Sequence, residues 1–234
     1  MSEARAVVSP VKEQMAHPLA HQFEDLEQQQ ETDTLGIWVF LVTEIMFFGG
    51  LFASYTIYRS FYPAAFEAGS RALNVRLGAT NTMVLLSSSF TMAMAVRCAQ
   101  TAQRKALMVF LVLTMVLGVL FLGIKGVEYH GEWVDRVVPG LNFAPQGELL
   151  QRFTAGGIGR AEMFMCFYFV MTGIHAIHMI IGLSLLLVLL LRARHGVFSS
   201  QYYAPVEVTG LYWHFVDIIW IFLFPLLYLV GGRF

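Results

Sequence analysis

Charged residues are scarce in this chain, and their scarcity defines its class. Lys, Arg, Asp and Glu together make up 13% of the 234 residues, whereas hydrophobic residues make up 57%. A soluble globular domain carries roughly 25% charged residues. The composition therefore indicates an integral membrane protein, and the net charge of −1 gives no reason to expect a nucleic-acid partner.

Cysteine is almost absent as well. The two cysteines, Cys98 and Cys166, lie far apart and form no Cys-x-x-Cys motif. This excludes a disulfide framework, a cysteine-based zinc site and a c-type haem attachment. The 12 methionines form no spaced pair with His or Cys, so we interpret them as packing residues and not as metal ligands.

Long polar stretches are missing except at residues 1–33. Acidic residues outnumber Arg5 and Lys12 there, and the part from 24 to 33 is low in complexity, so we predict a mobile acidic tail. The stretch has no apolar core, so we do not expect a cleaved signal peptide. His17 and His21 in this tail either are merely solvated or collect protons at the membrane surface.

Several long apolar stretches follow the tail. Because a membrane-spanning helix needs about 20 apolar residues, we predict an all-α, polytopic membrane protein whose residues 34–234 form a bundle of five transmembrane helices. The expected spans are 35–58, 77–96, 106–124, 163–191 and 208–232. The segment 125–162 is rich in Gly and Pro and is predicted to be a surface loop, with Glu128, Tyr129 and His130 in a solvated or headgroup-contacting turn.

The orientation of the chain is weakly encoded. Arg97, Arg104 and Lys105 crowd the short connection after the second span. Short loops weigh most in the positive-inside rule, so we expect this connection and the N-terminus to be cytoplasmic.

Polar residues inside the spans are the candidates for function, because a membrane-embedded ionisable group is costly and usually functional. Glu44 lies ~15 Å along the first span, near the middle of a bilayer. It is either a proton-handling or partner-contacting acid, or a carboxyl that is hydrogen-bonded to a neighbouring helix.

The fourth span carries one polar stripe, Tyr168, Thr172, His175 and His178, within an arc of ~120°. Two histidines three residues apart on one helix cannot ligate opposite faces of a haem. We therefore favour an interhelical hydrogen-bond network over a b-type cytochrome.

The fifth span carries His214 and Asp217, which share a helix face. They could pair with each other, or Asp217 could accept from His175 or His178. We favour a structural network of these residues, with a direct proton path as the alternative.

Five segments of the spans carry recognisable motifs: Gly36–Phe52, Asn81–Ser87, Gly123–His130, Phe169–Gly182 and Tyr212–Trp220. Together they resemble subunit III of the haem-copper oxidases, the cytochrome c oxidase subunit III family. The resemblance covers about residues 34–232, and Glu44 stands where that family has its membrane-buried acid. Because the chain starts at what would be the third helix of seven-helix members, it is similar to the short five-helix bacterial form.

The resemblance implies an accessory subunit of a respiratory terminal oxidase, which reduces O₂ to water and pumps protons across a bacterial plasma (inner) membrane. It implies no catalytic residue, metal or redox centre in this chain, with haems and copper held by partner subunits. It further implies contact mainly with subunit I and also with subunit II, bound phospholipid, support of proton uptake, and a Glu44 that faces subunit I.

Two alternatives remain open from the sequence. One is an accessory subunit of a quinol oxidase or a nitric oxide reductase, because the electron donor is bound by other subunits. The other is an independent proton transporter that uses Glu44 and Asp217. Transporters often contain inverted repeats and broken helices, and the sequence shows neither.

Overall fold

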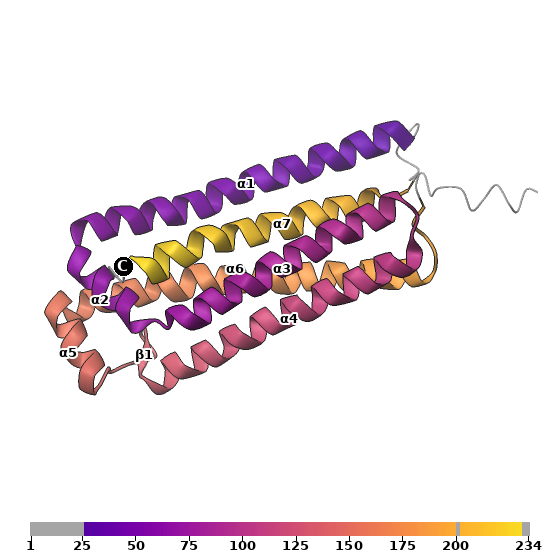
Figure 1. The fold of residues 1–234 in the computed structure, drawn as a ribbon. Coiled ribbons are helices and arrows are strands. Elements are labelled where there is room, and N and C mark those ends of the chain that lie inside the picture. The colour runs from indigo at the N-terminus through magenta and orange to yellow at the C-terminus, as the bar shows by residue number, and fades with distance from the viewer. Residues whose placement is uncertain (1–25, 200–201, 231–234) are drawn as a thin grey trace, which may run out of the picture.

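The computed structural model describes residues 26–199 and 202–230, which are almost entirely helical (Figure 1). Within these residues, 5 helices are long and apolar enough to cross a membrane, which confirms the predicted all-α, polytopic architecture. They are α1 (Leu26–Phe61), α3 (Val75–Gln100), α4 (Arg104–Val134), α6 (Ile158–Arg194) and α7 (Ala204–Phe224), the last continuing as the π-helix η2 (Pro225–Leu229).

The first helix begins earlier than the sequence suggests. Residues 26–33, predicted to belong to a mobile tail, form the first turns of α1. The rest of the predicted tail, with His17 and His21, lies outside the described residues.

The segment 125–162 differs from the predicted surface loop. Helix α4 does not end at Lys125 but continues to Val134, so Glu128, Tyr129 and His130 are helical and the expected turn is wrong. The charges do not end the helix because Lys125 and Glu128 find partners inside the bundle. A hairpin of β1 (Val137–Val138) and β2 (Asn142–Phe143) and the short helix α5 (Gly147–Gly156) complete the connection.

Local sequence explains where the helices begin. The Asn74 side chain caps α3 by accepting from the backbone N–H groups of Arg76 and Leu77 at 3.1 and 3.3 Å. Pro63 opens the short helix α2 (Pro63–Ala72), which connects α1 to α3. Gly157 separates α5 from α6 with φ of +88°, a conformation that favours glycine.

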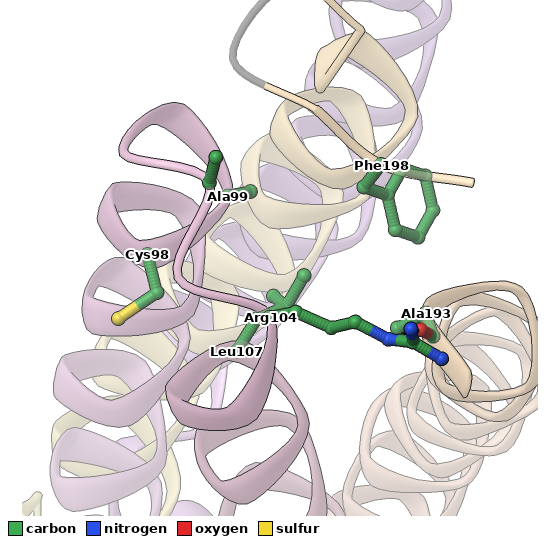
Figure 2. Close-up of a pocket in the computed structure, with 7 residues that line it drawn as sticks. Cys98, Ala99, Arg104, Leu107, Ala193 and Phe198 are labelled. Atoms are coloured by element: carbon green, nitrogen blue, oxygen red, sulfur yellow. Dashed lines mark hydrogen bonds between the residues drawn. The ribbon is translucent and has the colours of Figure 1, made fainter. Parts of the chain in front are cut away.

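Arg104, at the turn between α3 and α4, holds the end of α6. Its guanidinium lies beside Ala193 (Figure 2) and donates to the backbone oxygen of that residue at 2.8 Å. It also donates to the backbone oxygen of Arg194. A basic side chain at a helix C-terminus satisfies carbonyl groups that have no intrahelical partner. The adjoining pocket, between Cys98 and Phe198, has a cavity volume of about 10 Å³, so it admits roughly one water molecule.

Four of the long helices pack around a common core, and α1 lies at the edge. Helix α3 contacts α4 and α7, and α6 contacts α4 and α7, whereas α1 contacts chiefly α7 (Figure 1). The short helices α2 and α5 pack against each other at the end of the bundle near η2. Much of the apolar surface of α1, including Trp38, Met46 and Phe61, is exposed on the isolated chain.

Trp213 of α7 sets the spacing of the core. Its indole ring passes so close to Gly118 of α4 and Gly182 of α6 that an added Cβ would lie 2.9 and 3.0 Å from ring atoms. The indole N–H donates to the Ser88 hydroxyl of α3 at 3.0 Å. One fully buried side chain thus contacts three other helices, and two glycines make room for it.

We expect Gly182→Ala to lower the free energy of unfolding by about 1–3 kcal/mol, because the new methyl group overlaps the Trp213 ring. Gly123→Ala is the matched control, since nothing lies within 4 Å of a Cβ built at Gly123. Denaturant unfolding of both variants in the same detergent measures the difference. Equal stability of the two variants would contradict the close packing of Trp213.

Candidate functional site

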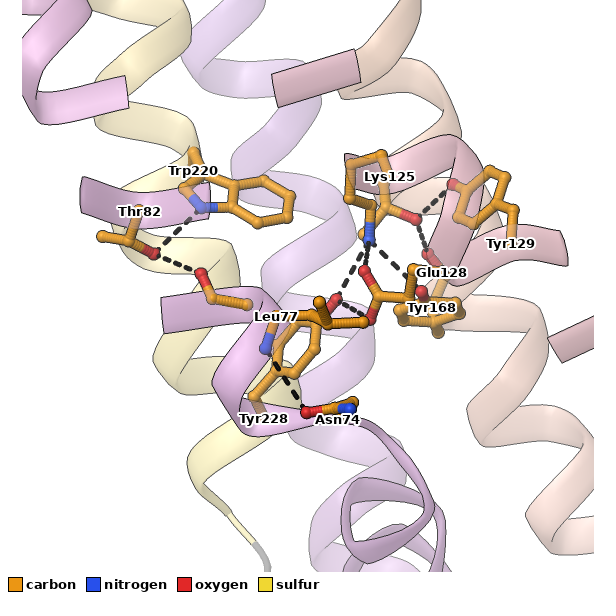
Figure 3. A network of polar contacts seen from close by, with 11 residues as sticks. Asn74, Leu77, Thr82, Lys125, Glu128, Tyr129, Tyr168, Trp220 and Tyr228 are labelled. Carbon is orange, nitrogen blue, oxygen red and sulfur yellow. Dashed lines mark hydrogen bonds and ion pairs between the residues drawn. The ribbon is translucent and has the colours of Figure 1, made fainter. Parts of the chain in front are cut away.

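Helix α4 carries a buried ion pair inside the bundle. The Lys125 ammonium lies 2.9 Å from Oε2 of Glu128, and both side chains are almost fully buried (Figure 3). Their spacing of three residues places them on one face of the helix. Because an isolated charge in a low-dielectric interior is very costly, each of the two ions needs the other.

Hydroxyl groups from two other elements complete the shell of this pair. The Lys125 ammonium donates to Tyr168 of α6 at 3.2 Å and to Tyr228 of η2 at 3.0 Å, while the Tyr228 hydroxyl donates to Oε1 of Glu128 at 2.6 Å. The ammonium also lies 4.9–5.7 Å from the ring centroids of Tyr129, Tyr168, Trp220 and Tyr228. Such distances permit cation–π attraction, so this group, which we call the Lys125 cluster, joins α4, α6, α7 and η2.

The sequence did not predict this cluster. Lys125 was expected at the end of a span and Glu128 in a surface turn, but both residues are buried, with exposed fractions of 3% and 4%. The signal was present, because an acid follows a base by three residues without an intervening proline. Opposite charges at that spacing can pair on a continuing helix.

Glu44, the acid singled out from the sequence, pairs within the chain. Its Oε2 lies 3.1 Å from Nε2 of His178, which joins α1 to α6. The Phe48 ring packs against the imidazole at 5.4 Å, and the Tyr212 hydroxyl donates to the His178 backbone oxygen at 3.0 Å. The carboxylate side chain remains 20% exposed, so it borders the surface that α1 presents outward.

The hydrogen bonds of His178 determine how many protons this pair holds. Nδ1 lies 2.9 Å from the Ile174 backbone oxygen, and a carbonyl can only accept, so Nδ1 carries a hydrogen. The short contact between Nε2 and Glu44 then needs one further proton, located on either the carboxyl or the imidazole. The Glu44–His178 pair therefore shares one proton.

Two other residues of the predicted polar stripe, Thr172 and Tyr168, belong to one network, whereas His175 does not. The Thr172 hydroxyl donates to the Tyr168 backbone oxygen at 2.6 Å and bonds Tyr129, a member of the Lys125 cluster, at 2.6 Å. His175 is enclosed by the rings of Phe121 and Trp220, with centroids at 5.5 and 5.1 Å. Within residues 26–199 and 202–230, neither ring nitrogen of His175 has a hydrogen-bond partner.

The pairing of His214 with Asp217, one of the two alternatives that the sequence left open, does not occur. Nδ1 of His214 bonds the Ser89 hydroxyl at 2.8 Å instead, since α7 lies against α3. Asp217 is buried between the levels of Trp213 and Trp220, and the Ser89 hydroxyl is the polar group that acts on its carboxyl, although no described residue reaches full hydrogen-bond geometry with either oxygen. It therefore accepts from neither His175 nor His178.

Hydroxyl groups of α3 connect it to its neighbours. Trp220 donates from its indole N–H to Thr82 at 3.1 Å, and Thr91 bonds Thr114 of α4 at 2.8 Å. In lipid, such bonds between helices supply specificity that apolar side chains cannot provide. The described part of the chain contains no group of three or more His, Cys, Asp or Glu side chains that could hold a metal ion.

These features define a polytopic helical membrane protein whose polar interior ties its own helices together. The family model for cytochrome c oxidase subunit III matches residues 24–134 and 154–232. The chain therefore belongs to the cytochrome c oxidase subunit III family, as its motifs indicated, and is part of a terminal oxidase complex.

Relatives named cytochrome c oxidase subunit 3 and relatives named quinol oxidase subunit 3 both match most of the chain. A cytochrome c oxidase subunit 3 of Synechocystis sp. is 35% identical over 83% of this chain and 74% of its own length. The protein of the same name from Thermostichus vulcanus is 31% identical over 84% of this chain and 86% of its own length. A quinol oxidase subunit 3 of Bacillus subtilis is 28% identical, covering 88% and 92% respectively.

We expect Lys125→Met to destabilise the chain by about 3–5 kcal/mol, because it leaves the Glu128 carboxylate buried without its counterion. The double variant Lys125→Met/Glu128→Gln removes both charges and should recover most of the loss. Denaturant unfolding of the full-length chain measures both effects. If the double variant were no more stable than the single one, the ion pair would not be the cause.

Proposed function

We propose that this chain is the accessory subunit III of a respiratory oxidase that reduces O₂ to water and pumps protons, and that it carries no redox centre itself. The observation that supports this most is the family match, which extends through all five spans. The bonding of the buried polar groups also supports an accessory role. The Lys125 cluster and the Glu44–His178 pair bond residues of this same chain, so these side chains are occupied in holding the bundle together.

Subunit I of the oxidase is the proposed main partner, with subunit II as a further contact and the haems and copper held by these partners. The exposed apolar side chains of α1, with Glu44 at their border, favour α1 as part of the contact with subunit I and bound phospholipid. We further propose a bacterial plasma membrane, with the N-terminus on the cytoplasmic side beside Arg97, Arg104 and Lys105.

The Glu44–His178 pair is the proposed proton-handling element. It shares one proton and retains an exposed edge, so a neighbouring subunit or water can exchange that proton. This role supports proton uptake and sustained turnover by the complex, without making Glu44 a catalytic residue.

Purification through a tag on this chain tests the assignment. We expect a polypeptide with haem and copper to copurify, giving the reduced-minus-oxidised spectrum of a haem-copper oxidase. A tagged chain that is isolated alone under mild extraction, or that by itself supports proton flux in liposomes, would contradict the proposal. The relatives' names suggest two electron donors, cytochrome c and quinol. To decide between them, the rates at which the same preparation oxidises reduced cytochrome c and quinol are compared.

We expect Glu44→Gln to leave assembly intact, because the Gln amide can still donate to Nε2 of His178 in place of the shared proton. The variant complex should lose activity faster during sustained turnover or pump protons less efficiently. Steady-state O₂ consumption, proton pumping and turnover lifetime are measured on the purified complex.

Thr43→Ala is the matched control, since Thr43 is exposed on the same helix and its hydroxyl donates to the Phe40 backbone oxygen at 2.7 Å. Native behaviour of Glu44→Gln in all three measurements would eliminate the proton-handling role, while copurification would still support the subunit assignment.

A further inference from the structure

Helix α7 presents one side outward between α1 and α3. Three of its residues, His214, Ile218 and Ile221, are spaced by four and three positions, so they share that side of the helix. Both isoleucines are exposed and His214 is partly exposed. The neighbours of α7 include α1 and α3, and it is seen between them in Figure 1. We call these three residues the His214 face.

Polar groups without a full set of partners gather at this face. Nδ1 of His214 bonds the Ser89 hydroxyl at 2.8 Å, whereas its Nε2 forms no hydrogen bond with residues 26–199 or 202–230. Behind them lies Asp217, which is 2% exposed and whose two oxygens are enclosed without a hydrogen-bond partner among the same residues. Ser89 is the polar group that acts on this carboxyl.

The depth of these groups in the membrane excludes water and lipid as partners. His214 follows the start of the fifth span at Ala204 by ten residues, or ~15 Å. Ser89 precedes the end of α3 at Gln100 by eleven residues, or ~16 Å. The hydrocarbon core is about 30 Å thick, so both residues lie near its middle. Lipid chains there neither donate nor accept hydrogen bonds, so a partner for Nε2 has to come from protein.

We propose that the His214 face binds a transmembrane helix of a neighbouring subunit, and that this helix presents a hydrogen-bond acceptor to Nε2 of His214. The exposed Ile218 and Ile221 supply apolar contact around that bond. The face adjoins α1, so a single partner can contact both. The inference rests on the proposed function, in which α1 meets another subunit within the membrane.

The hydrogen bonds indicate why the partner group is an acceptor. Neutral side chains cost least at this depth. A neutral Asp217 carries its own hydrogen, which leaves the single hydroxyl hydrogen of Ser89 for Nδ1 of His214. An imidazole that accepts at Nδ1 carries its hydrogen on Nε2 and donates from there. A hydroxyl, an amide oxygen or a carboxylate on the partner helix meets this requirement.

Photo-crosslinking of the full-length chain in its native membrane tests the contact. Benzoyl-phenylalanine replaces Ile218, and in the matched control it replaces Val116, which is exposed on α4. We expect the probe at position 218 to crosslink to another subunit of the complex and the probe at position 116 to react with lipid. A product of position 218 with lipid alone, or with a second copy of this chain, would overturn the proposal.

Two variants separate binding of a partner from a role inside the chain. The side chain of His214→Asn can replace Nδ1 toward Ser89 but is too short to replace Nε2, whereas that of His214→Gln reaches the position of Nε2. The subunit that crosslinks to position 218 should dissociate from His214→Asn in mild detergent roughly 3- to 10-fold faster than from the native chain. It should stay with His214→Gln. The reverse ranking would show that only the bond to Ser89 matters.

The native chain separates this inference from the assignment on which it rests. If a polypeptide with haem and copper copurifies but position 218 crosslinks to no subunit, the contact at the His214 face is wrong and the subunit assignment stands. If the native chain is isolated alone, the proposed function fails as well.

Discussion

The structure depends on one interaction, the buried ion pair of Lys125 and Glu128, because two charges without water need polar partners inside the protein. The remaining hydrogen bonds of the pair come from Tyr168 of α6 and Tyr228 of η2. Apolar side chains pack about as well against lipid as against each other. The polar bonds therefore select which helices lie together.

The need for polar partners separates the bundle into a fixed part and an outward-facing part. Helices α3, α4, α6 and α7 are joined by the Lys125 cluster, by the indole bonds of Trp213 and Trp220, and by the Thr91–Thr114 bond. Helix α1 is attached by fewer polar contacts, chiefly Glu44 with His178 and the Tyr55 hydroxyl with the Leu226 backbone oxygen. This arrangement suits a subunit whose core is self-contained and whose first helix meets a partner.

Sequence alone predicted what depends on local pattern. The length of the apolar stretches predicted the five helices, and the acid in the middle of the first span singled out Glu44, which pairs with His178. It did not predict which helix faces which. The spacing of His214 and Asp217 placed them on one face, but only the position of α3 shows that Ser89 is the partner of His214. The burial of Lys125 was missed for a related reason. A charged residue marks the end of a membrane span only when no partner for it lies inside the bundle, and Lys125 has such a partner in Glu128.

The most direct test of this account is a high-resolution cryo-electron microscopy map of the intact membrane complex. The account predicts that the Lys125 ammonium lies within hydrogen-bond distance of Glu128, Tyr168 and Tyr228 of its own chain after assembly, as it does in the isolated chain. A Lys125 side chain that turned toward a carboxylate of a neighbouring subunit would contradict the claim that this subunit satisfies its buried charges internally.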